Sequence, residues 1–443
     1  MRAFICAAEN KFFYTLVYNP ENGNSQYLLR RNGTYYFFVK FGKMRILFVC
    51  QYFFPEVFRG NEIAFHWAEA GHDVHVVCGI PNYPRGKHFK GYGFFKNRFE
   101  IIKGVRVTRV LSLPRGNNRL MLALNYLSYS ISAWMYVLFH ALSHKYDMVF
   151  VQQLSPVMMS APGVLYKRLR QVPLYTWVLD LWPESLTAVG RINNKMILSY
   201  INLFVKSEYR HSKKLLISSR SFERSIERYG DYHNKIVYYP QWSDIDDHEV
   251  ICPIKPPVIP EGFKLMFAGT VGEAQDFECI MQAALLAKKH SDIKWIIVGD
   301  GQKLEWVKQF VVEHNLEDSV YPLGYFPVET MPWFFAQADA MLVALRNDPL
   351  FNLYVPAKIS SYMAAGKPIV SILNGEGADV IREADCGWTL TASDADGLAR
   401  LVTELARKDK EELAEKGANG EAYYKSHFQK EKCLRELDAI LGL

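Results

Sequence analysis

The segment VPAKISSYMAAGKPIVSILNGEGADVIREADCG, residues 355–387, governs how the rest of the chain is interpreted. Its first part predicts a helix that starts near Lys358, because Ile359, Tyr362 and Met363 are apolar at helical spacing. The opening of the segment therefore favours an amphipathic helix packed on a domain.

The second part of the segment ends that helix and starts a new one. Gly366 and Pro368 are typical of a helix C-terminus, and residues 369–372 form a short apolar strand. The turn 374–377 then leads into a second helix. A turn before a helix presents unpaired backbone N–H groups, which suit an anion such as a diphosphate. An ordinary helix–turn–strand unit without a ligand remains the alternative.

Two series of strands and helices lie on either side of a proline-rich segment. Short apolar runs without alternation recur in both series, as in parallel sheets that helices cover on both faces. The density of prolines between them disfavours a helix and marks a linker. We therefore predict a domain over residues 44–240, a linker over 241–262, a second domain over 263–415 and a C-terminal helix over 416–443.

Residues 1–43 are less typical of a folded domain. They hold the turn-rich stretches NPENGNSQ and RRNGT, whereas Met44 opens the apolar run MRILFVC in the manner of a natural start. Our hypothesis is that residues 1–43 extend outside the fold, so that their deletion leaves activity and melting temperature nearly unchanged. A genuine accessory hairpin is the alternative.

Two carboxylates, Asp180 and Glu184, follow the predicted strand Leu174–Leu179 in the run DLWPES. This position suits a sugar site, because carboxylates accept hydrogen bonds from hydroxyls and the neighbouring Trp182 ring can stack on a pyranose. Asp180 can position an acceptor hydroxyl or take its proton. Its alternative role is to cap the following helix, and both roles can hold together.

The run P-x-K-x-x-x-Y-M-A-A-G-K-P from Pro356 and the turn G-E-G-A-D-V-I from Gly375 resemble the donor-sugar site of family-4 retaining glycosyltransferases. The similarity is to the subgroup that acts on bacterial O-antigen, capsule and exopolysaccharide repeats, and the DLWPES run resembles its acceptor-side domain. The resemblance implies the α/β fold called GT-B, in which two Rossmann-like parallel-sheet domains face a central cleft. It also implies that the last helix crosses back onto the first domain.

The resemblance implies a set of donor contacts from the second domain: Gly269, Gly272, Gln275, Gly324, Arg346, Lys358 and Glu376. Many members carry an Arg and a Lys in the first loop, where this chain has Thr270 and Gln275. The usual cationic clamp on the diphosphate is therefore missing there. Arg346 and Lys358 are the expected replacements, because Arg forks onto phosphate oxygens and Lys acts as a point charge. A solvated surface charge is the alternative for both.

A second departure concerns the contact with the nucleotide ribose. Most members carry two Glu residues before the M-A-x-G run, and the matching positions here are Leu353 and Ser361. The ribose contact therefore cannot be carried over, and Glu376 is the substitute.

The first domain of such enzymes begins with a strand, a loop and a helix, which implies acceptor-side loop contacts from Glu56, Gly60 and Asn82. Members often have paired glycines in this loop, and Gly60 stands alone here. Its contact with donor phosphates is therefore open, and a rigid turn built by two prolines is the alternative role of the loop at Asn82.

Composition excludes several classes of protein. Apolar residues make up 49% and charged residues 22% of the chain, which is ordinary for a globular protein. The net charge of +6 permits contact with anionic lipid, but no basic stripe or zinc-finger spacing indicates nucleic acid. The scattered cysteines, with no CxxC pair, favour a reducing compartment. We expect no nucleic-acid partner, no metal, no cofactor and a cytoplasmic location without a cleavable signal peptide.

Residues 120–142 contain no Asp, Glu, Lys or Arg, so that their length alone makes a membrane span conceivable. Their polar residues nevertheless form one helical stripe, and their apolar residues another. A buried domain helix and a helix that lies on a membrane are therefore the two other interpretations. Arg115, Arg119 and Lys145 flank the segment and can meet anionic headgroups.

These patterns predict a retaining glycosyltransferase that moves a hexose or N-acetylated hexose from a UDP-sugar to a lipid-linked saccharide, without a metal. We expect it at the inner face of the cytoplasmic membrane if residues 120–142 contact lipid. Two alternatives remain: a UDP-sugar epimerase of the GT-B fold, and a nucleotide-sugar-binding assembly protein without turnover.

Overall fold

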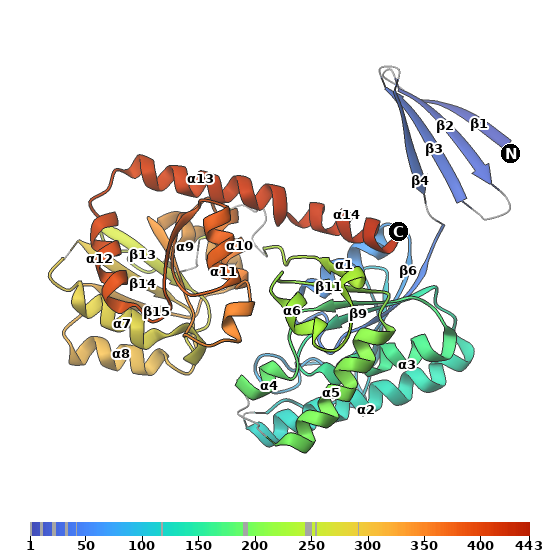
Figure 1. Cartoon of the computed structure of the whole chain (residues 1–443), viewed down its shortest axis with the longest axis horizontal. Coiled ribbons are helices and arrows are strands. Elements are labelled where there is room, and N and C mark those ends of the chain that lie inside the picture. Colours follow the sequence, from blue (N-terminus) through green and yellow to red (C-terminus); the bar gives the residue numbers. More distant parts are fainter. Residues whose placement is uncertain are drawn as a thin grey trace.

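The computed structural model describes the chain except for residues 1, 9–11, 20–23, 32–33, 41, 117, 189–193, 244–249, 253–254 and 291. Figure 1 shows two α/β domains side by side, joined along one edge by two helices, with a separate small sheet at the N-terminus.

The first domain is built on an eight-stranded sheet in the order β12-β11-β10-β9-β5-β6-β8-β7. Neighbouring strands of this sheet are parallel, except that β7 and β8 are antiparallel. The strands are β5 Arg45–Val49, β6 Asp73–Cys78, β7 Phe99–Ile102, β8 Val105–Arg109, β9 Met148–Gln153, β10 Leu174–Val178, β11 Lys214–Ile217 and β12 Ile236–Tyr238. The central strands are buried on both faces, which explains why their sequences do not alternate.

Helices cover both faces of this sheet. Those of the first domain are α1 Arg59–Glu69, α2 Arg119–Ser143, α3 Ala161–Arg170, α4 Glu184–Ala188, α5 Lys195–His211 and α6 Phe222–Glu227, with the short 3-10 helices η1 Val157–Ser160 and η2 His233–Lys235. Trp67 of α1 packs with Phe48 and Phe150 on one face. Tyr129 of α2 and Tyr166 of α3 belong to the apolar cluster on the other face.

The second domain holds a parallel six-stranded sheet in the order β15-β14-β13-β16-β17-β18. The strands are β13 Phe263–Ala268, β14 Ile293–Val298, β15 Val320–Gly324, β16 Ala340–Ala344, β17 Ile369–Ile372 and β18 Gly387–Leu390. The helices are α7 Phe277–Leu286, α8 Leu304–Glu313, α9 Met331–Gln337, α10 Ala357–Ala364, α11 Glu376–Glu383 and α12 Ala395–Leu405, with the short η3 Glu273–Gln275, η4 Val328–Thr330 and η5 Phe351–Leu353.

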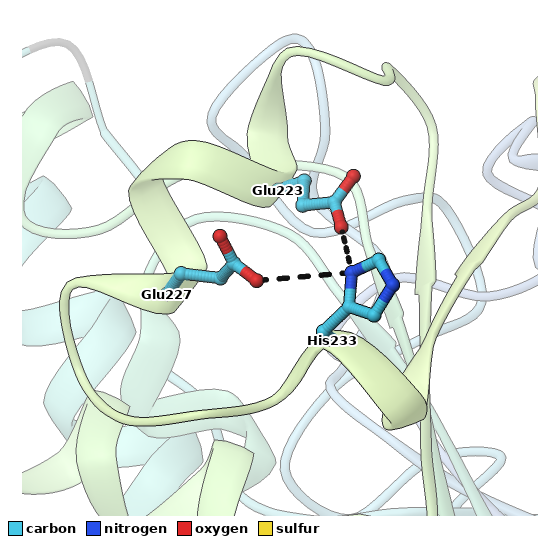
Figure 2. A group of neighbouring side chains, drawn as sticks. All are labelled: Glu223, Glu227 and His233. Atoms are coloured by element: carbon cyan, nitrogen blue, oxygen red, sulfur yellow. Dashed lines mark hydrogen bonds and ion pairs between the residues drawn. The ribbon is translucent and has the colours of Figure 1, made fainter.

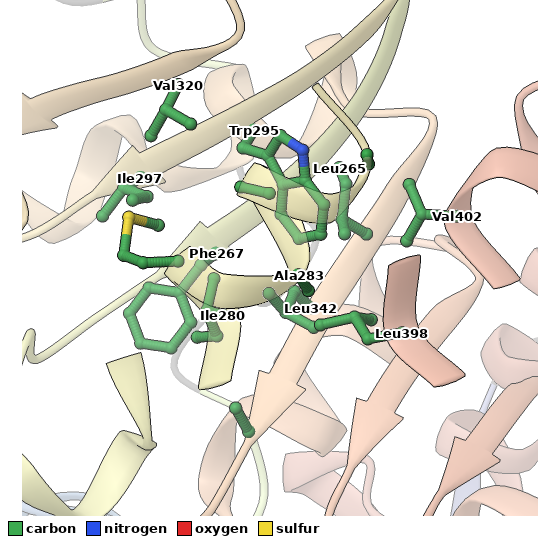
Figure 3. Close-up of a cluster of buried hydrophobic side chains, with 14 of the residues drawn as sticks. Leu265, Phe267, Ile280, Ala283, Trp295, Ile297, Val320, Leu342, Leu398 and Val402 are labelled. Carbon is green, nitrogen blue, oxygen red and sulfur yellow. The ribbon is translucent and has the colours of Figure 1, made fainter. Parts of the chain in front are cut away.

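One face of this second sheet packs on α7, α8 and α12. Figure 3 shows Phe267 and Trp295 of the sheet in one cluster with Ile280 of α7, and Leu398 and Val402 of α12 lie at its edge. Burying these large apolar side chains on both faces of each sheet is the main stabilising term for such a fold.

Two C-terminal helices join the domains. The single helix expected at the end of the chain is wrong, because the chain turns at the buried Phe428 between α13 Lys410–His427 and α14 Lys430–Leu441. α14 lies on the first domain (Figure 1): Asp438 accepts hydrogen bonds from Trp67 Nε1 at 2.8 Å and contacts His66 Nε2 at 2.7 Å. Leu437 of α14 is buried in the first-domain core. The end of the chain therefore holds the two domains together.

The N-terminal residues form an antiparallel sheet of their own. Its strands are β1 Arg2–Ala8, β2 Phe12–Asn19, β3 Asn24–Arg31 and β4 Thr34–Lys40, paired in chain order. None of these strands joins the two large sheets, and Figure 1 shows the small sheet standing apart from them. Whether residues 1–43 are dispensable stays a prediction.

Candidate active site

Glycines line the C-terminal edge of the second sheet, where ligands bind in parallel α/β sheets. Gly269 directly follows β13 with a φ of +132°, and Gly324 ends β15 with a φ of +81°. Between them, a side chain on Gly299 would come within 1.8 Å of the Gly269 carbonyl oxygen. The loops can therefore stack only because these positions are glycine. A backbone ledge free of side chains is the result.

The Lys358 side chain lies against this stretch of glycine backbone. Tyr362, one turn later on α10, holds the end of β13: its hydroxyl accepts from Ala268 N–H at 3.0 Å and donates to Ala268 C=O at 3.1 Å. The same helical face places Lys358 against Gly269, where a Cβ would meet Lys358 Cε at 2.6 Å.

The ammonium nitrogen of Lys358 is buried and, among the described residues, has no hydrogen-bond partner. It lies 3.4 Å from the centre of the Phe267 ring, a cation–π contact. Burial lowers the pKa of Lys358 to about 7. A buried cation without a counterion beside a glycine ledge is suited to an incoming anion.

Arg346 lies at the same edge, after β16. Its backbone N–H donates to the Ala274 carbonyl at 2.9 Å, and its exposed guanidinium is 3.8 Å from Glu273. Gln275 and Gly272 belong to the same short loop, since the Gln275 N–H donates to the Gly272 carbonyl. The structure thus brings the predicted loop and Arg346 together, while their contacts with a donor stay a prediction.

Glu376 starts α11 and turns toward the first domain. It is 7% exposed and accepts a hydrogen bond from Ser221 Oγ at 2.6 Å. Next to it, Arg220 pairs with Glu383 at 2.8 Å. Glu376 is therefore engaged in a contact between the domains in this structure, and its role at a ribose stays a prediction.

Asp180 lies directly after β10, on the first domain. Its carboxylate accepts from Ser155 Oγ at 2.7 Å, and Ser155 in turn accepts from Trp182 Nε1 at 3.0 Å. Gln153 Nε2 fixes the backbone by donating to the Asp180 carbonyl at 2.9 Å. Burial raises the pKa of Asp180, and the hydrogen bonds from Ser155 and Tyr354 oppose that rise.

Tyr354, from the second domain, bridges the two halves of the site. Its hydroxyl accepts from Leu181 N–H at 2.9 Å and lies 3.3 Å from Asp180 Oδ1 and 3.2 Å from Ser185 Oγ. Its ring packs against Phe222 of α6 at 4.9 Å. Tyr354 lies four residues before Lys358, in the extended backbone that leads into α10, so the segment that carries the buried cation also touches the carboxylate.

Glu184, the second predicted carboxylate, is paired with an arginine of the first domain. It forms an ion pair with Arg228, and its side chain is 19% exposed. One of its carboxylate oxygens is buried and has no partner among the described residues. The geometry gives Glu184 a structural contact, and a catalytic role for it stays a prediction.

The predicted acceptor-side loops meet one another. Glu56, 2% exposed, accepts from the backbone N–H groups of Asn82 at 2.8 Å and Tyr83 at 2.6 Å. Burial raises the pKa of Glu56 to about 7. Asn82 also accepts from Arg115 N–H at 3.0 Å. Gly60 allows close packing of α1, because a Cβ there would meet Gln152 at 2.1 Å. These residues shape the loops, and their contact with an acceptor stays a prediction.

The orientation of α2 settles part of the question raised by residues 120–142. Its polar stripe faces the domain: Asn125 Oδ1 accepts from Gln51 at 2.9 Å, Ser128 from Leu113 N–H at 2.9 Å, and His140 contacts Tyr146 at 2.8 Å. Its apolar stripe faces outward, with exposures between 37% and 74% for Leu120, Leu124, Leu127, Ile131, Trp134, Met135, Phe139 and Leu142. We call these eight residues the outer face of α2.

The alternative that α2 spans a membrane is wrong. Within the described part of the chain, every helix is too short or too polar to cross a bilayer. The interpretation as a buried domain helix holds for the inner face, where Tyr129, Ala133 and Val137 lie in the core of the first domain, whereas the outer face of α2 is exposed.

One surface group has the residue types of a metal site. Figure 2 shows Glu223 and Glu227 of α6 facing His233 of η2, whose Nδ1 lies 2.7 Å from Glu223 and 3.9 Å from Glu227. The glutamate raises the pKa of His233, as in an ion pair on the surface. Glu227 and His233 are exposed and Glu223 is partly exposed, and such acidic surface groups are common without a bound ion. The D-x-D run at residues 244–246, which its place by the linker makes unsuitable for a donor diphosphate, lies outside the described residues.

The two-domain fold, with the candidate site where the domains meet, is the fold of GT-B proteins. The comparisons with known proteins agree. Residues 262–408 match the family model described as Glycosyl transferases group 1. Over 250 residues, covering 53% of this chain and 61% of the relative, the chain is 29% identical to the probable glycosyltransferase WbjE of Pseudomonas aeruginosa. It is 22% identical to the putative colanic acid biosynthesis glycosyltransferase WcaL of Escherichia coli, over 43% of this chain and 47% of that protein.

Solved structures show the same fold. The Anabaena protein Alr3699/HepE in complex with UDP and glucose superposes with a TM-score of 0.63 and 14% identity, over 90% of this chain and 99% of that one. The matched segment spans about half to three fifths of the curated relatives named above. These findings confirm the resemblance to glycosyltransferases and the GT-B fold that the sequence predicts.

Sequence reasoning missed several residues of the site. Tyr354 and Ser155 contact Asp180, Tyr362 positions Lys358, and Ser221 contacts Glu376. Only Tyr362 had a local signal, its position one turn after Lys358. The others contact partners far away in the chain, which no local pattern reveals.

Proposed function

We propose that this protein is a retaining glycosyltransferase of surface polysaccharide biosynthesis. It transfers a sugar from a nucleotide sugar, UDP-linked, to a lipid-linked saccharide. The observation that carries the proposal is the position of Tyr354. Its hydroxyl lies next to the Asp180 carboxylate of the first domain, and its own segment of the second domain leads to the Lys358 cation and the glycine loops. A transferase of two substrates needs such a meeting point between its domains.

The donor lies on the second domain in this proposal. The backbone at Gly269, Gly272 and Gly324 contacts the diphosphate. The Lys358 ammonium supplies positive charge beside it. Arg346 and Gln275 contact the same phosphates from the adjoining loop, and Glu376 hydrogen-bonds the ribose. The solved structure of HepE holds UDP and glucose, which supports a UDP-sugar as the first donor to test.

The chemistry requires stabilisation of a leaving diphosphate and removal of a proton from the acceptor. Lys358 and Arg346 place positive charge where negative charge develops as the sugar–phosphate bond breaks. Asp180, whose pKa burial raises, orients the acceptor hydroxyl and accepts its proton. Neither task needs a protein nucleophile or a metal in this proposal.

The acceptor reaches the first domain from a membrane. The outer face of α2 carries no charged side chain, and Arg119 and Lys145 lie at its two ends. This pattern fits an anionic bilayer surface, into which the apolar stripe dips while the cations meet the headgroups. The protein then works at the inner face of the cytoplasmic membrane.

The experiment combines donor binding with turnover. A thermal-shift screen of UDP-sugars identifies the donor, and UDP release is then measured with and without a lipid-linked saccharide extract. Acceptor-dependent release, with the anomeric configuration of the donor retained in the product by NMR, supports the proposal. Release without an acceptor supports the epimerase instead, and binding without any release supports an assembly protein.

A further inference from the structure

The two oxygens of the Asp180 carboxylate have different kinds of partner. Oδ2 accepts a hydrogen bond from Ser155 Oγ at 2.7 Å, and Ser155 belongs to the same domain. Oδ1 has the hydroxyl of Tyr354 at 3.3 Å, and Tyr354 belongs to the other domain. One oxygen is therefore held within the first domain, whereas the contact of the other depends on how the two domains are placed.

Trp182 supports Ser155 from the interior of the first domain. Its indole Nε1–H donates to Ser155 Oγ at 3.0 Å, and its side chain is only 6% exposed. The ring belongs to a buried apolar cluster with Val178 and Ile201. It is therefore not free to stack on a pyranose, which its place in the DLWPES run suggests.

The direction of both hydrogen bonds follows from the chemistry of the groups. An indole N–H can only donate, and an ionised carboxylate can only accept. The Ser155 hydroxyl lies between them, so it accepts from Trp182 and gives its single proton to Asp180. Each bond in such a chain polarises the next, and a bond to a charged acceptor is the stronger one. The chain therefore favours the ionised form of the carboxylate.

The sheet fixes the position of Ser155 relative to Asp180. Ser155 follows the end of β9 by two residues, and Asp180 follows the end of β10 by two residues. Because β9 and β10 pair in parallel, their C-terminal ends lie side by side. Gln153, the last residue of β9, donates from Nε2 to the Asp180 carbonyl oxygen at 2.9 Å. The serine and the carboxylate thus meet although they are 25 positions apart.

Two titratable hydroxyls act on the Asp180 carboxylate from other elements. Tyr354 approaches from the segment before α10, and the charge of Asp180 raises the pKa of Tyr126 on α2, adding to the larger effect of burial. Burial raises the pKa of Tyr354 as well, so both tyrosines stay neutral near pH 7 and bring no positive charge to the carboxylate. Once the domains separate, Ser155 is the donor that remains on Asp180.

We propose that Ser155 and Trp182 are positioning residues for the transfer reaction: they hold Asp180 by Oδ2 in its ionised form and leave Oδ1 for the acceptor hydroxyl once Tyr354 has moved away. This rests on the proposed function, in which Asp180 takes the proton of the acceptor. In that step the acceptor O–H proton passes to Oδ1 and the acceptor oxygen bonds to the sugar. The leaving UDP keeps the electron pair of the broken sugar–phosphate bond, and the proton on Oδ1 is later released to solvent.

The first experiment measures UDP release, with a lipid-linked saccharide extract as the acceptor, as a function of pH. Ser155→Ala should lower kcat/KM about tenfold or more, the effect of losing a hydrogen bond to a charged group. It should also move the acid limb to higher pH, because Asp180 loses a donor that favours its ionised form. Trp182→Phe should have a smaller effect in the same direction, and Ser155→Thr, which keeps the hydroxyl, should restore most of the loss.

Ser160→Ala is the matched control for Ser155→Ala. Ser160 is a buried serine of the same segment, and its hydroxyl donates to the Val157 carbonyl oxygen at 2.7 Å. Its removal should leave kcat/KM and the acid limb unchanged. An unmoved acid limb in Ser155→Ala, or an equal loss in Ser160→Ala, overturns the proposal.

The second experiment needs no substrate. The free energy of unfolding in urea is measured from pH 4 to pH 8 for the full chain and for Ser155→Ala, each with and without Asp180→Asn. Burial raises the pKa of Asp180 in the folded state, and loss of Ser155 should raise it further. The folded variant then keeps its proton to a higher pH, so the stability difference caused by Ser155→Ala should increase as pH rises. In the Asp180→Asn background this difference should be independent of pH.

A difference that is independent of pH in both backgrounds gives Ser155 a structural role alone and overturns the proposal. If Ser155→Ala fails to fold, Trp182→Phe carries both measurements with the same signs, and the absence of any pH-dependent effect in it overturns the proposal equally.

Failure of this inference is separable from failure of the proposed function. A protein that releases no UDP from any UDP-sugar contradicts the proposed function, while the unfolding measurements still decide whether Ser155 acts on Asp180. Turnover that depends on Asp180 but not on Ser155 contradicts only the positioning role.

Discussion

The hydroxyl of Tyr354, on the second domain, lies 3.3 Å from the carboxylate of Asp180, on the first. The same hydroxyl accepts the Leu181 N–H, so the tyrosine is held by the loop that carries the carboxylate. Any opening of the domains about the linker must break these contacts. The state of the carboxylate and the relative position of the domains are therefore coupled through one side chain.

Replacing Tyr354 by Phe should separate this coupling from packing. The ring keeps its contact with Phe222, so the unfolding free energy should fall by only about 1 kcal/mol for the lost hydrogen bonds. Turnover should fall about 10- to 100-fold. Because the tyrosine hydrogen bond lowers the pKa of Asp180, its loss should move the acid limb of kcat/KM to higher pH.

Tyr229→Phe is the matched control for Tyr354→Phe. Its hydroxyl donates to Asn202 Oδ1 at 2.8 Å within the first domain. Equal kinetic losses in the two variants, or an unshifted acid limb in Tyr354→Phe, would assign Tyr354 to stability alone.

Asp180→Asn should abolish proton transfer while it keeps the shape of the site. We expect a loss of about 10²–10⁴ in kcat, the range for general acid–base groups, with the affinity for UDP unchanged. Glu184→Gln serves as the comparison, because the partner of this carboxylate is Arg228 and not Tyr354 or Asp180. Single-turnover assays and calorimetry of UDP binding measure the two quantities. A fall in kcat that is larger for Glu184→Gln would reverse the assignment.

Lys358→Met should move stability and donor binding in opposite directions. Its buried ammonium has no counterion, so an apolar side chain of similar length should raise the unfolding free energy at pH 7 by about 1–4 kcal/mol, as for other buried charges. UDP affinity should fall at least tenfold at the same pH. Lower stability together with unchanged affinity would rule out the phosphate role.

The pH dependence of Lys358 has a definite sign. Burial depresses its pKa to about 7, against about 10.4 in an unfolded chain. Between these values the unfolded state binds more protons, so this residue makes stability rise with pH across that window. UDP affinity should instead decrease as pH rises above 7, and Lys358→Arg should flatten that decrease. Titration calorimetry from pH 6 to pH 9 measures it.

The outer face of α2 should bind vesicles. Ile131→Glu and Trp134→Glu place charge on the exposed stripe without disturbing the polar contacts beneath it. Retention on vesicles with anionic lipid should drop several-fold for both, and high salt should weaken retention of the unmodified protein. Leu169→Glu, on the exposed surface of α3, is the control. Equal retention of all four proteins would leave the face without a lipid role.

His75 of β6 and His140 of α2 both contact the Tyr146 hydroxyl, and this histidine pair should make the fold acid-sensitive. Burial lowers the pKa of His75 to about 3 and that of His140 to about 4, against about 6.5 in an unfolded chain. Below pH 6.5 the unfolded state therefore binds more protons, and stability falls as pH falls toward these values. His75→Gln should reduce this slope in urea unfolding at pH 7 and pH 5, whereas His233→Gln, at the exposed ion pair, should not.

The fold was within reach of the sequence because its signals are local. Apolar runs without alternation predict strands of parallel sheets, and the prolines between the two series predict a linker. The edge strand β7 was not predicted, because the alternation of its exposed residues is weak and its pairing depends on the neighbouring strand β8. The break between α13 and α14 was also not predicted. Phe428 is apolar in a helix-like pattern, and it turns inward only through tertiary packing.

The sequence by itself determined the class of fold, the loops that end each strand and the residues offered there, Asp180 and Lys358 among them. It left the direction of each face of α2 open, since a helix with a polar and an apolar stripe can turn either one inward. Only the tertiary structure decided that the polar stripe packs on the domain and that Tyr354 meets Asp180. Such contacts join residues that are 174 positions apart, and their geometry depends on how two finished domains pack.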